Sequence, residues 1–286
     1  MTSELRGRID AALTTFLDGR REELGRTEPA VLELLDEVRR LQDAGGKRIR
    51  PAFCYWGFRA GGGPGAGEAG ERIVRAAAAL ELLHTMALIH DDLMDCAKER
   101  RGVAATAVWF SERARELGVP GDPEAFGLAT AVLVGDLAAV FADRMLLEAG
   151  FAPDALARAL AEYHPMRERM AIGQFLDVGG AAGDPEVARR AAALKGGSYT
   201  VEGPLLIGAA LAGASDRVGD RLRRFGRPLG EAFQLRDDLE DGDALPGMDR
   251  AIVNGLVAEA KRALDPGALG SEPVRALGEL ADLVAM

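Results

Sequence analysis

Length, composition and charge limit what this chain can be. Its 286 residues include 45 acidic and 35 basic side chains, a formal net charge of −10. That charge argues against nucleic acid or an anionic membrane surface as the principal partner. Apolar residues make up 48% of the chain but aromatic residues only 5%, which favours long, closely packed helices over sheets. An anionic substrate would therefore need a local cationic patch or a bound metal ion.

The sequence also sets expectations about location. Residues 1–13 lack the uninterrupted apolar core of a signal peptide. No stretch of membrane-spanning length is free of charged residues, so we expect no integral membrane segment. The two cysteines, Cys54 and Cys96, suggest neither a disulfide framework nor a metal site. We therefore expect a cytoplasmic protein.

Clusters of glycine, proline and aspartate divide the chain into helical stretches. In chain order, they predict breaks at residues 61–70, 118–123, 150–154, 179–185, 213–216, 242–247 and 265–271. The apolar stretches between them, such as 69–95, 126–149 and 216–241, are too long for ordinary strands. We predict an all-α fold, a bundle of long helices around a central cavity, formed by a single domain over residues 1–286.

A glycine-rich basic segment lies early in the chain. It reads Gly45-Gly46-Lys47-Arg48-Ile49-Arg50-Pro51. Glycines let backbone amides approach an anion, lysine supplies a point charge, and arginine offers a two-pronged donor to phosphate oxygens. The spacing differs from that of nucleotide-binding loops. Alone, such a segment is more often the basic start of a helix than an anion site, so its interpretation depends on the other motifs.

An acidic cluster ends the stretch 69–95. Asp91 and Asp95 stand four residues apart, with Asp92 beside the first, so Asp91 and Asp95 share one face of a helix. Close carboxylates repel one another and oppose the helix dipole at a C-terminus. Mg²⁺ reverses that cost, since it binds one or two carboxylates and takes further ligands from water and phosphate. The plainer interpretation is a solvated acidic helix end.

The same arrangement occurs a second time, at the end of the stretch 216–241. It consists of Asp237, Asp238 and Asp241. Separate cations accompany the two clusters, namely Arg100, Arg101 and Lys195. Two clusters at helix ends weaken the plainer interpretation. The combination suits two substrates that each carry a diphosphate.

These motifs, in this order, resemble those of the trans-isoprenyl (polyprenyl) diphosphate synthases, the group of the farnesyl and geranylgeranyl diphosphate synthases. The match runs from about Gly45 to Asp241. Besides the basic segment and the acidic clusters, it is carried by Glu81-Leu82-Leu83-His84-Thr85, Arg100-Arg101-Gly102, Gly173-Gln174-Phe175-Leu176-Asp177 and Phe233-Gln234. The resemblance implies a magnesium-dependent prenyltransferase with an isoprenoid synthase-type fold, which condenses isopentenyl diphosphate with an allylic diphosphate, and a homodimer.

The resemblance also implies roles for single residues. Three Mg²⁺ ions on the allylic diphosphate would be bound with the help of Asp91, Asp95 and Asp237, supported by Asp92, Asp238 and Asp241, the last as a further metal ligand. The same substrate would be contacted by Arg100, Lys195 and Gln234. The diphosphate of isopentenyl diphosphate would be held by Gly46, Lys47, Arg50, His84 and Arg101. Gln174 and Asp177 would line the site.

Two other functions remain open. A class I terpene cyclase also ionises diphosphates on a helical fold, but its second metal motif normally mixes Asn, Ser or Thr, and Glu. Here the second motif is again built of aspartates, and Gly46, Lys47 and Arg50 offer a pocket for a second diphosphate. A non-catalytic regulatory subunit of a prenyl synthase would be favoured by degraded acidic clusters, whereas both are intact.

The sequence departs from the family's pattern after Asp241. Family members usually continue into a glycine- and lysine-containing loop and further helices, whereas here the chain runs almost directly into its C-terminal helices. Either this flap is truly deleted or a segment is left out of the sequence; we favour the second, because the flap carries a lysine and a lid that excludes water. Two smaller departures are Gly196, where Thr is frequent, and Trp109, near the position of a usual histidine.

Product length is expected to depend on the helix that precedes Asp91. An isoprene unit spans roughly 5 Å, about one helical turn, and Met86 and Ala87 lie about one turn before the cluster. An aromatic residue there closes the floor for farnesyl products in the family. Neither residue is aromatic, and methionine is flexible, so Leu83 would set the floor. We expect geranylgeranyl diphosphate as the main product.

Overall fold

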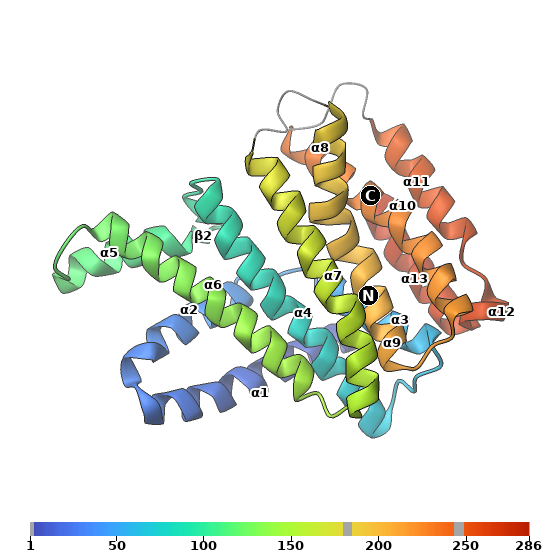
Figure 1. The fold of residues 1–286 in the computed structure, drawn as a ribbon, viewed down its shortest axis with the longest axis horizontal. Helices are drawn as coiled ribbons and strands as arrows, with labels where there is room; N and C mark the ends of the chain where they lie inside the picture. The colour runs from blue at the N-terminus through green and yellow to red at the C-terminus, as the bar shows by residue number, and fades with distance from the viewer. Residues whose placement is uncertain (1–2, 180–184, 243–248, 286) are drawn as a thin grey trace. The chain divides into compact units, whose positions relative to one another are not determined.

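The structure, a computed structural model, describes residues 3–179, 185–242 and 249–285. In this part of the chain, helices and one short ribbon follow one another (Figure 1). The elements are α1 (Ser3–Thr27), η1 (Pro29–Val31), α2 (Leu32–Asp43), α3 (Ile49–Ala60), α4 (Gly67–Met94), β1 (Glu99–Arg100), β2 (Val103–Ala104), α5 (Thr106–Leu117), α6 (Pro123–Leu147), α7 (Pro153–Val178), α8 (Pro185–Ala192), η3 (Ala193–Glu202), α9 (Gly203–Leu211), α10 (Asp216–Asp241), α11 (Arg250–Arg262), α12 (Pro266–Leu269) and α13 (Ser271–Ala285). The all-α prediction is confirmed.

Contacts divide the chain into two compact units. The first unit comprises Gly7–Arg48 and Ala78–Ala149, and the second unit comprises Met1–Arg6, Ile49–Ala77 and Gly150–Met286. Because the helix α4 runs from Gly67 to Met94, it contributes to both. The prediction of a single domain over the whole chain stays a prediction.

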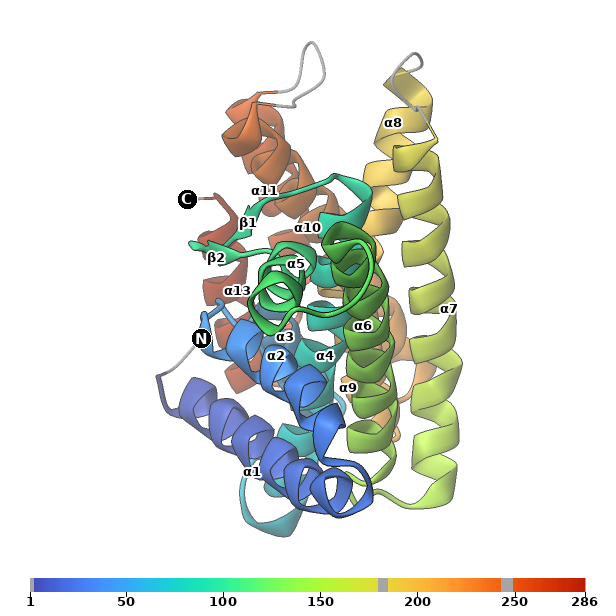
Figure 2. The same cartoon turned by 90° about the vertical axis from the view of Figure 1, so that its left-hand side faces the viewer.

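The first unit is built around α6, which packs against α5 and α2. Figure 2 shows α5 lying against α6. Gly127 of α6 makes this close approach possible, because a Cβ there would meet the Ser111 side chain and the Ala107 carbonyl oxygen. Phe16 of α1 meets Phe141 of α6 edge to face, with ring centroids 5.8 Å apart. Helix α1 is thereby held against the same apolar core.

The second unit places η3 between α7 and α10, and α3 against α9. The contact between α3 and α9 is a backbone approach. A Cβ at Gly57 of α3 would fall on the Leu205 carbonyl, and a Cβ at Gly208 of α9 would fall on the Cys54 carbonyl. Helix α10 also packs on α11, which in turn contacts α13. The unit thus presents the C-terminal ends of α7 and α10 on either side of η3.

Most predicted helix breaks agree with the observed ends. Helix α5 ends at Gly118, whose φ of 65° favours glycine, and α6 begins after Asp122, whose side chain caps the Glu124 amide. The predicted break at 265–271 contains the four-residue helix α12. Residues 180–184 and 243–248, where two predicted breaks and the junction after Asp241 fall, lie outside the described residues.

Two described helices, α4 and α6, are long and apolar enough to cross a membrane by length and composition. Of the apolar window in α4, 72% is buried inside the protein, and of that in α6, 44%. Each window still contains charged residues, such as Arg75 in α4 and Asp136 in α6. The burial of α4 is that of a core helix.

Candidate active site

The first acidic cluster lies where α4 ends. Asp92 is buried, with 6% of its surface exposed, whereas Asp91 is half-buried and Asp95 is exposed. The chain then reverses through Cys96, which adopts a φ of 52°, and through the ribbon of β1 and β2. This reversal brings Arg100 back to the cluster, where its Nε donates to Asp92 Oδ1 at 2.7 Å and its Nη2 lies 3.7 Å from Asp91 Oδ2.

The electrostatics of this pair follow from its burial. Loss of water raises the pKa of the Asp92 carboxyl above its ordinary value, although the hydrogen bonds from Arg100 act in the opposite direction. Burial disfavours the Arg100 cation as well, but Asp92 and Asp91 outweigh this effect and raise the pKa of Arg100. Arg100 therefore neutralises the inner aspartate, while Asp91 and Asp95 remain accessible on one helix face.

The first residues of the basic segment, Gly45 to Arg48, lie in the same unit, in the loop between α2 and α3, whereas Arg50 belongs to α3 and to the second unit. Arg101 Nη1 donates to the carbonyl oxygen of Gly45, and its Nη2 lies 3.4 Å from His84 Nε2. A Cβ at Gly46 would lie 3.4 Å from Arg101 Nη1. Lys47 is exposed. The structure thus brings together Gly46, His84 and Arg101, three of the residues predicted to hold one diphosphate.

The second acidic cluster, at the end of α10, has different partners. Gln234 Nε2 donates to Asp238 Oδ1 at 2.7 Å, one helical turn apart. Arg236, only 6% exposed, donates to Asp237 Oδ1 at 2.6 Å and to the Leu283 carbonyl at 3.0 Å. Both aspartates are half-buried. The side chain of the third, Asp241, lies outside what the structure describes.

The segment before α9 supplies the other predicted residues of the second unit. Lys195 Nζ donates to Asp177 Oδ2 of α7 at 2.8 Å, and Gln174, one turn earlier on α7, is half-buried. Gly196 lies against Gln234, whose side-chain oxygen occupies the space that a Cβ would need. The absence of the family's threonine at this position therefore has a steric reason.

Arg50 is fixed by two residues of η3. Its Nη2 donates to Thr200 Oγ1 at 2.9 Å, and its guanidinium lies 4.5 Å from the centroid of the Tyr199 ring. Both η3 residues are buried, with 1% and 4% exposed. Such a stacked, hydrogen-bonded arginine is ordered before any ligand arrives. No sequence pattern indicated Thr200 or Tyr199 as partners of Arg50.

The residues predicted to limit product length, which together form the proposed product-length ruler, lie on α4. Met86 is buried with 9% exposed, Leu83 is fully buried, and Ala87 is half-buried. Ala87 precedes Asp91 by one turn on the same helix face. Small or flexible side chains therefore line the turn of α4 before the acidic cluster.

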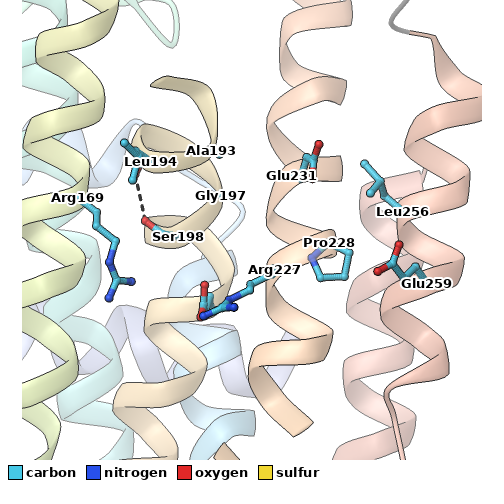
Figure 3. A pocket seen from close by; sticks show the side chains of 11 residues that line it. Arg169, Ala193, Leu194, Gly197, Ser198, Arg227, Pro228, Glu231, Leu256 and Glu259 are labelled. Carbon is cyan, nitrogen blue, oxygen red and sulfur yellow. Dashed lines mark hydrogen bonds and ion pairs between the residues drawn. The ribbon is translucent and has the colours of Figure 1, made fainter. Parts of the chain in front are cut away.

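A cavity of about 480 Å³ also exists in the second unit (Figure 3). It is lined by Arg169, Ala193, Leu194, Gly197, Ser198, Glu202, Arg227, Pro228, Glu231, Leu256 and Glu259. None of these is a predicted site residue. Arg227, which is labelled in Figure 3, forms an ion pair with Glu202 at 3.0 Å. The lining carries three carboxylates, Glu202, Glu231 and Glu259, against two arginines, Arg169 and Arg227, so its charge does not favour a diphosphate.

The donors at the helix ends fit magnesium. Asp91 and Asp95 offer accessible carboxylates on one face, and Asp237 and Asp238 offer two more on α10. Among the described residues, no three His, Cys, Asp or Glu side chains converge on one point. Mg²⁺ does not require such a cage, since it usually keeps waters and binds through one or two carboxylates and substrate phosphates.

The fold and the paired acidic motifs define a class of all-helical proteins with an aspartate cluster at the end of each of two long helices. The model of the polyprenyl synthetase family matches residues 32–246, and the chain belongs to this family. It is 31% identical over 240 residues to the geranylgeranyl diphosphate synthase of Methanosarcina mazei, covering 82% of this chain and 63% of that protein. It is 33% identical over 212 residues to the chloroplastic geranylgeranyl pyrophosphate synthase of Capsicum annuum, covering 69% and 50%.

Among solved structures, the chain resembles the geranylgeranyl pyrophosphate synthase of Corynebacterium glutamicum, complexed with isoprenyl diphosphate and magnesium. The TM-score is 0.79 at 29% identity, over 99% of this chain and 87% of that one. The chain spans between half and two thirds of the length of these curated relatives.

Proposed function

We propose that the protein is a trans-prenyltransferase that condenses isopentenyl diphosphate with an allylic diphosphate to a longer prenyl diphosphate. The observation that carries this proposal is the pair of aspartate clusters at the ends of α4 and α10 in a chain of the polyprenyl synthetase family. The allylic C–O bond breaks and its electron pair leaves with pyrophosphate. The isopentenyl double bond then forms the new C–C bond, and the released pyrophosphate takes the proton that is lost.

Magnesium is the cofactor of this proposal, with three ions expected when substrate is bound. Asp91, Asp95, Asp237 and Asp241 are the proposed ligands. Bound magnesium would act as a Lewis acid that withdraws charge from the departing diphosphate. The relative of known structure from Corynebacterium glutamicum, which was complexed with isoprenyl diphosphate and magnesium, supports this choice.

The chain's own cations bind and orient the two diphosphates. Arg100, Lys195 and Gln234 are proposed to contact the allylic diphosphate, with Gln174 and Asp177 beside them. Asp177 holds the Lys195 ammonium at 2.8 Å, so the charge is ordered before substrate binds. The other diphosphate is assigned to Gly46, Lys47, Arg50, His84 and Arg101. Ordered donors of this kind stabilise the developing negative charge without further reorganisation.

Turnover of purified protein tests the proposal. Isopentenyl diphosphate and an allylic diphosphate should give a longer prenyl diphosphate and pyrophosphate only when Mg²⁺ or a similar ion is present. Cyclised hydrocarbon as the sole product would instead indicate a terpene cyclase. No turnover, combined with stimulation of an active prenyl synthase, would indicate a regulatory subunit. The intact aspartate clusters favour the first outcome.

Geranylgeranyl diphosphate is the proposed main product. The non-aromatic Met86 and Ala87 support it, as do the names of the relatives. Product chromatography of the wild type and of Met86→Phe tests the ruler, because a phenylalanine one turn before Asp91 should stop the chain at farnesyl diphosphate. Unchanged product lengths would remove α4 as the ruler.

A homodimer is proposed for the assembled protein. Along α6, large apolar side chains are exposed, namely Phe126, Leu128, Val132, Leu133, Val140 and Leu147. A second copy of this chain, pairing through the same face, would cover them. Light scattering at micromolar concentration should give twice the chain mass, whereas Leu133→Glu should give a monomer. A monomeric wild type would contradict the proposal.

We also propose that the protein works in the cytoplasm, with no integral membrane segment and no nucleic acid partner. Cys54 and Cys96 are both free thiols, and free thiols persist in a reducing compartment. The burial of α4 and the proposed dimer face on α6 account for the two described helices that are long and apolar enough to cross a membrane. Fractionation of cells should leave the protein in the supernatant after membranes are removed.

A further inference from the structure

Arg48, in the middle of the basic segment, has no role in the function proposed above. Its side chain is only 6% exposed, whereas its neighbour Lys47 points into solvent. A buried guanidinium is costly unless every donor finds an acceptor. The partners of Arg48 therefore indicate what the burial achieves.

Three elements of the first unit supply those partners. Arg48 Nε donates to Asp10 Oδ1 of α1 at 2.8 Å, and Nη1 donates to Glu81 Oε2 of α4 at 2.8 Å. Nη2 donates to the carbonyl oxygen of Gln42 at 3.0 Å, where α2 ends. Glu81 is itself only 3% exposed. One guanidinium thus ties α1, α2 and α4 together directly beneath the loop.

Further hydrogen bonds stabilise the contact between the end of α2 and α4. Gln42 Nε2 donates to the Glu81 carbonyl oxygen at 3.0 Å and to Thr85 Oγ1 at 2.5 Å. Thr85 directly follows His84, which lies 3.4 Å from Arg101. The end of α2 is therefore fastened to the turn of α4 that presents His84.

The backbone of the loop above this network is restricted at Arg48 and at Gly46. Arg48 itself adopts a φ of 51°, a left-handed conformation that non-glycine residues rarely adopt. A Cβ at Gly46 would lie 3.1 Å from Arg48 Nη1 and 3.4 Å from Arg101 Nη1. Gly46 is thus enclosed between two guanidinium groups, one buried and one exposed.

We propose that Arg48 is a positioning residue, which holds the loop of Gly45, Gly46 and Lys47 in register with His84 and Arg101 so that these groups form one site for the diphosphate of isopentenyl diphosphate. This inference rests on the proposed function. In this proposal Arg48 does not contact the substrate. Its buried guanidinium instead fixes the distances between the loop, His84 and Arg101, which do contact it.

Charge alone does not perform this task. Burial disfavours the Arg48 cation, but Glu81 and Asp10 outweigh it, so the pKa of Arg48 is raised above its ordinary value. A lysine would keep that charge, yet its single ammonium cannot span three acceptors arranged around a planar fork. Arg48→Lys therefore separates the geometry of the network from its charge.

Steady-state kinetics with both substrates test the proposal. Arg48→Lys should raise the KM for isopentenyl diphosphate about 10–100-fold, the loss expected for one or two charge-assisted hydrogen bonds. The KM for the allylic diphosphate and kcat should change less than about threefold. Asp10→Ala removes only one, half-exposed acceptor, and should raise the same KM about twofold to fivefold. This second variant decides the matter if Arg48→Lys does not fold.

A matched control lies in the same unit. Arg144 also makes three hydrogen bonds, to Glu23 of α1 and to Glu148, but it does not touch the loop. Arg144→Lys should leave both KM values unchanged. Equal rises in both KM values for Arg48→Lys, or lost thermal stability with unchanged KM, would reduce Arg48 to a structural residue and overturn the proposal.

Hydrogen exchange separates this inference from the proposed function. The amides of residues 44–47 should exchange faster in Arg48→Lys than in the wild type, while those of α6 should not. Unchanged exchange in the loop would overturn the positioning role. If the wild type fails to use isopentenyl diphosphate, the proposed function is wrong, and the exchange comparison alone still decides whether Arg48 holds the loop.

Discussion

The two aspartate clusters share a spacing but not an environment. At the end of α4, the middle residue Asp92 is buried and paired with a cation, Arg100, that comes from beyond the helix. At the end of α10, the middle residue Asp238 is half-buried and receives a neutral amide, Gln234, from one turn earlier in its own helix. The difference extends to the first position, where Asp237 is bonded to Arg236 at 2.6 Å.

This difference teaches that one motif can be stabilised in two ways. In the first cluster, an outside cation offsets the repulsion among three carboxylates, so that cluster depends on the chain reversal through β1 and β2. The second cluster is held by side chains of α10 itself. Replacing the middle aspartate, Asp92 or Asp238, should therefore have unequal effects in the two clusters.

The largest loss of kcat is expected from replacing the first aspartate of either cluster, and here the two clusters should respond alike. Asp91→Ala or Asp237→Ala removes a proposed magnesium ligand, and loss of several kcal/mol of charge stabilisation corresponds to about 10²–10³-fold in kcat. Helicity by circular dichroism should stay unchanged, because both residues lie at the surface of helix ends. Turnover with varied Mg²⁺ measures the loss.

Glu240→Gln provides the control for this comparison. Glu240 is exposed and lies at the end of the same helix as Asp237, so its replacement lowers the local negative charge without removing a proposed ligand. Its kcat should stay within about threefold of the wild type. Normal turnover in Asp91→Ala or Asp237→Ala would exclude that aspartate from the mechanism.

The second-largest effect is expected from replacing the middle aspartate, and it should differ between the two clusters. Asp92→Asn leaves Arg100 without its carboxylate, and the guanidinium, already 3.7 Å from Asp91, would turn to a proposed metal ligand. We expect kcat/KM to fall about 10–100-fold, the usual cost of losing a supporting partner of a ligand. Asp238→Asn keeps an oxygen for Gln234 and should cost only about threefold. Equal losses in the two variants would contradict the contrast.

A smaller loss of activity is expected when the hydrogen bond between Gln234 and Asp238, both on α10, is broken. In Gly196→Ala, the new Cβ would displace the Gln234 side-chain oxygen, so the amide would leave Asp238. We expect about a fivefold fall in kcat/KM for the allylic substrate, one neutral hydrogen bond. Gly219→Ala on α10 is the control, because only the flexible end of Arg223 lies near its Cβ. Full activity of Gly196→Ala would mean that the hydrogen bond from Gln234 to Asp238 does not contribute to activity.

Much of this architecture was predictable from the sequence, because local rules determine it. Glycine and proline clusters gave the ends of α3, α5 and α9, and the four-residue spacing placed Asp91 and Asp95 on one face of α4. Lys195 and Asp177 are both expected in the site from the sequence, but the ion pair between them is not.

The partners chosen by each aspartate were not predictable, for a physical reason. Arg100 reaches Asp92 through a chain reversal in which Cys96 adopts a φ of 52°, and nothing in the cysteine side chain favours this conformation. The π-helical segment η3 reads as ordinary helix. The burial of Arg48 likewise depends on Asp10, which is 38 residues away along the chain. Such long-range contacts leave no periodic signal.

The smallest expected effect uses Cys96, which directly follows Asp95 and has no counterpart at the second cluster. Cys96 is exposed, whereas Cys54 is fully buried and burial raises the pKa of its thiol well above the ordinary value. A thiol reagent should therefore label one cysteine in the native protein and two in denaturant. Mg²⁺ with pyrophosphate should slow the labelling of Cys96 about twofold to threefold, by limiting access to the end of α4. Because the probe reports on the first cluster alone, Asp91→Ala should abolish this protection. Protection that persists in Asp91→Ala would show that the first cluster does not hold the ion.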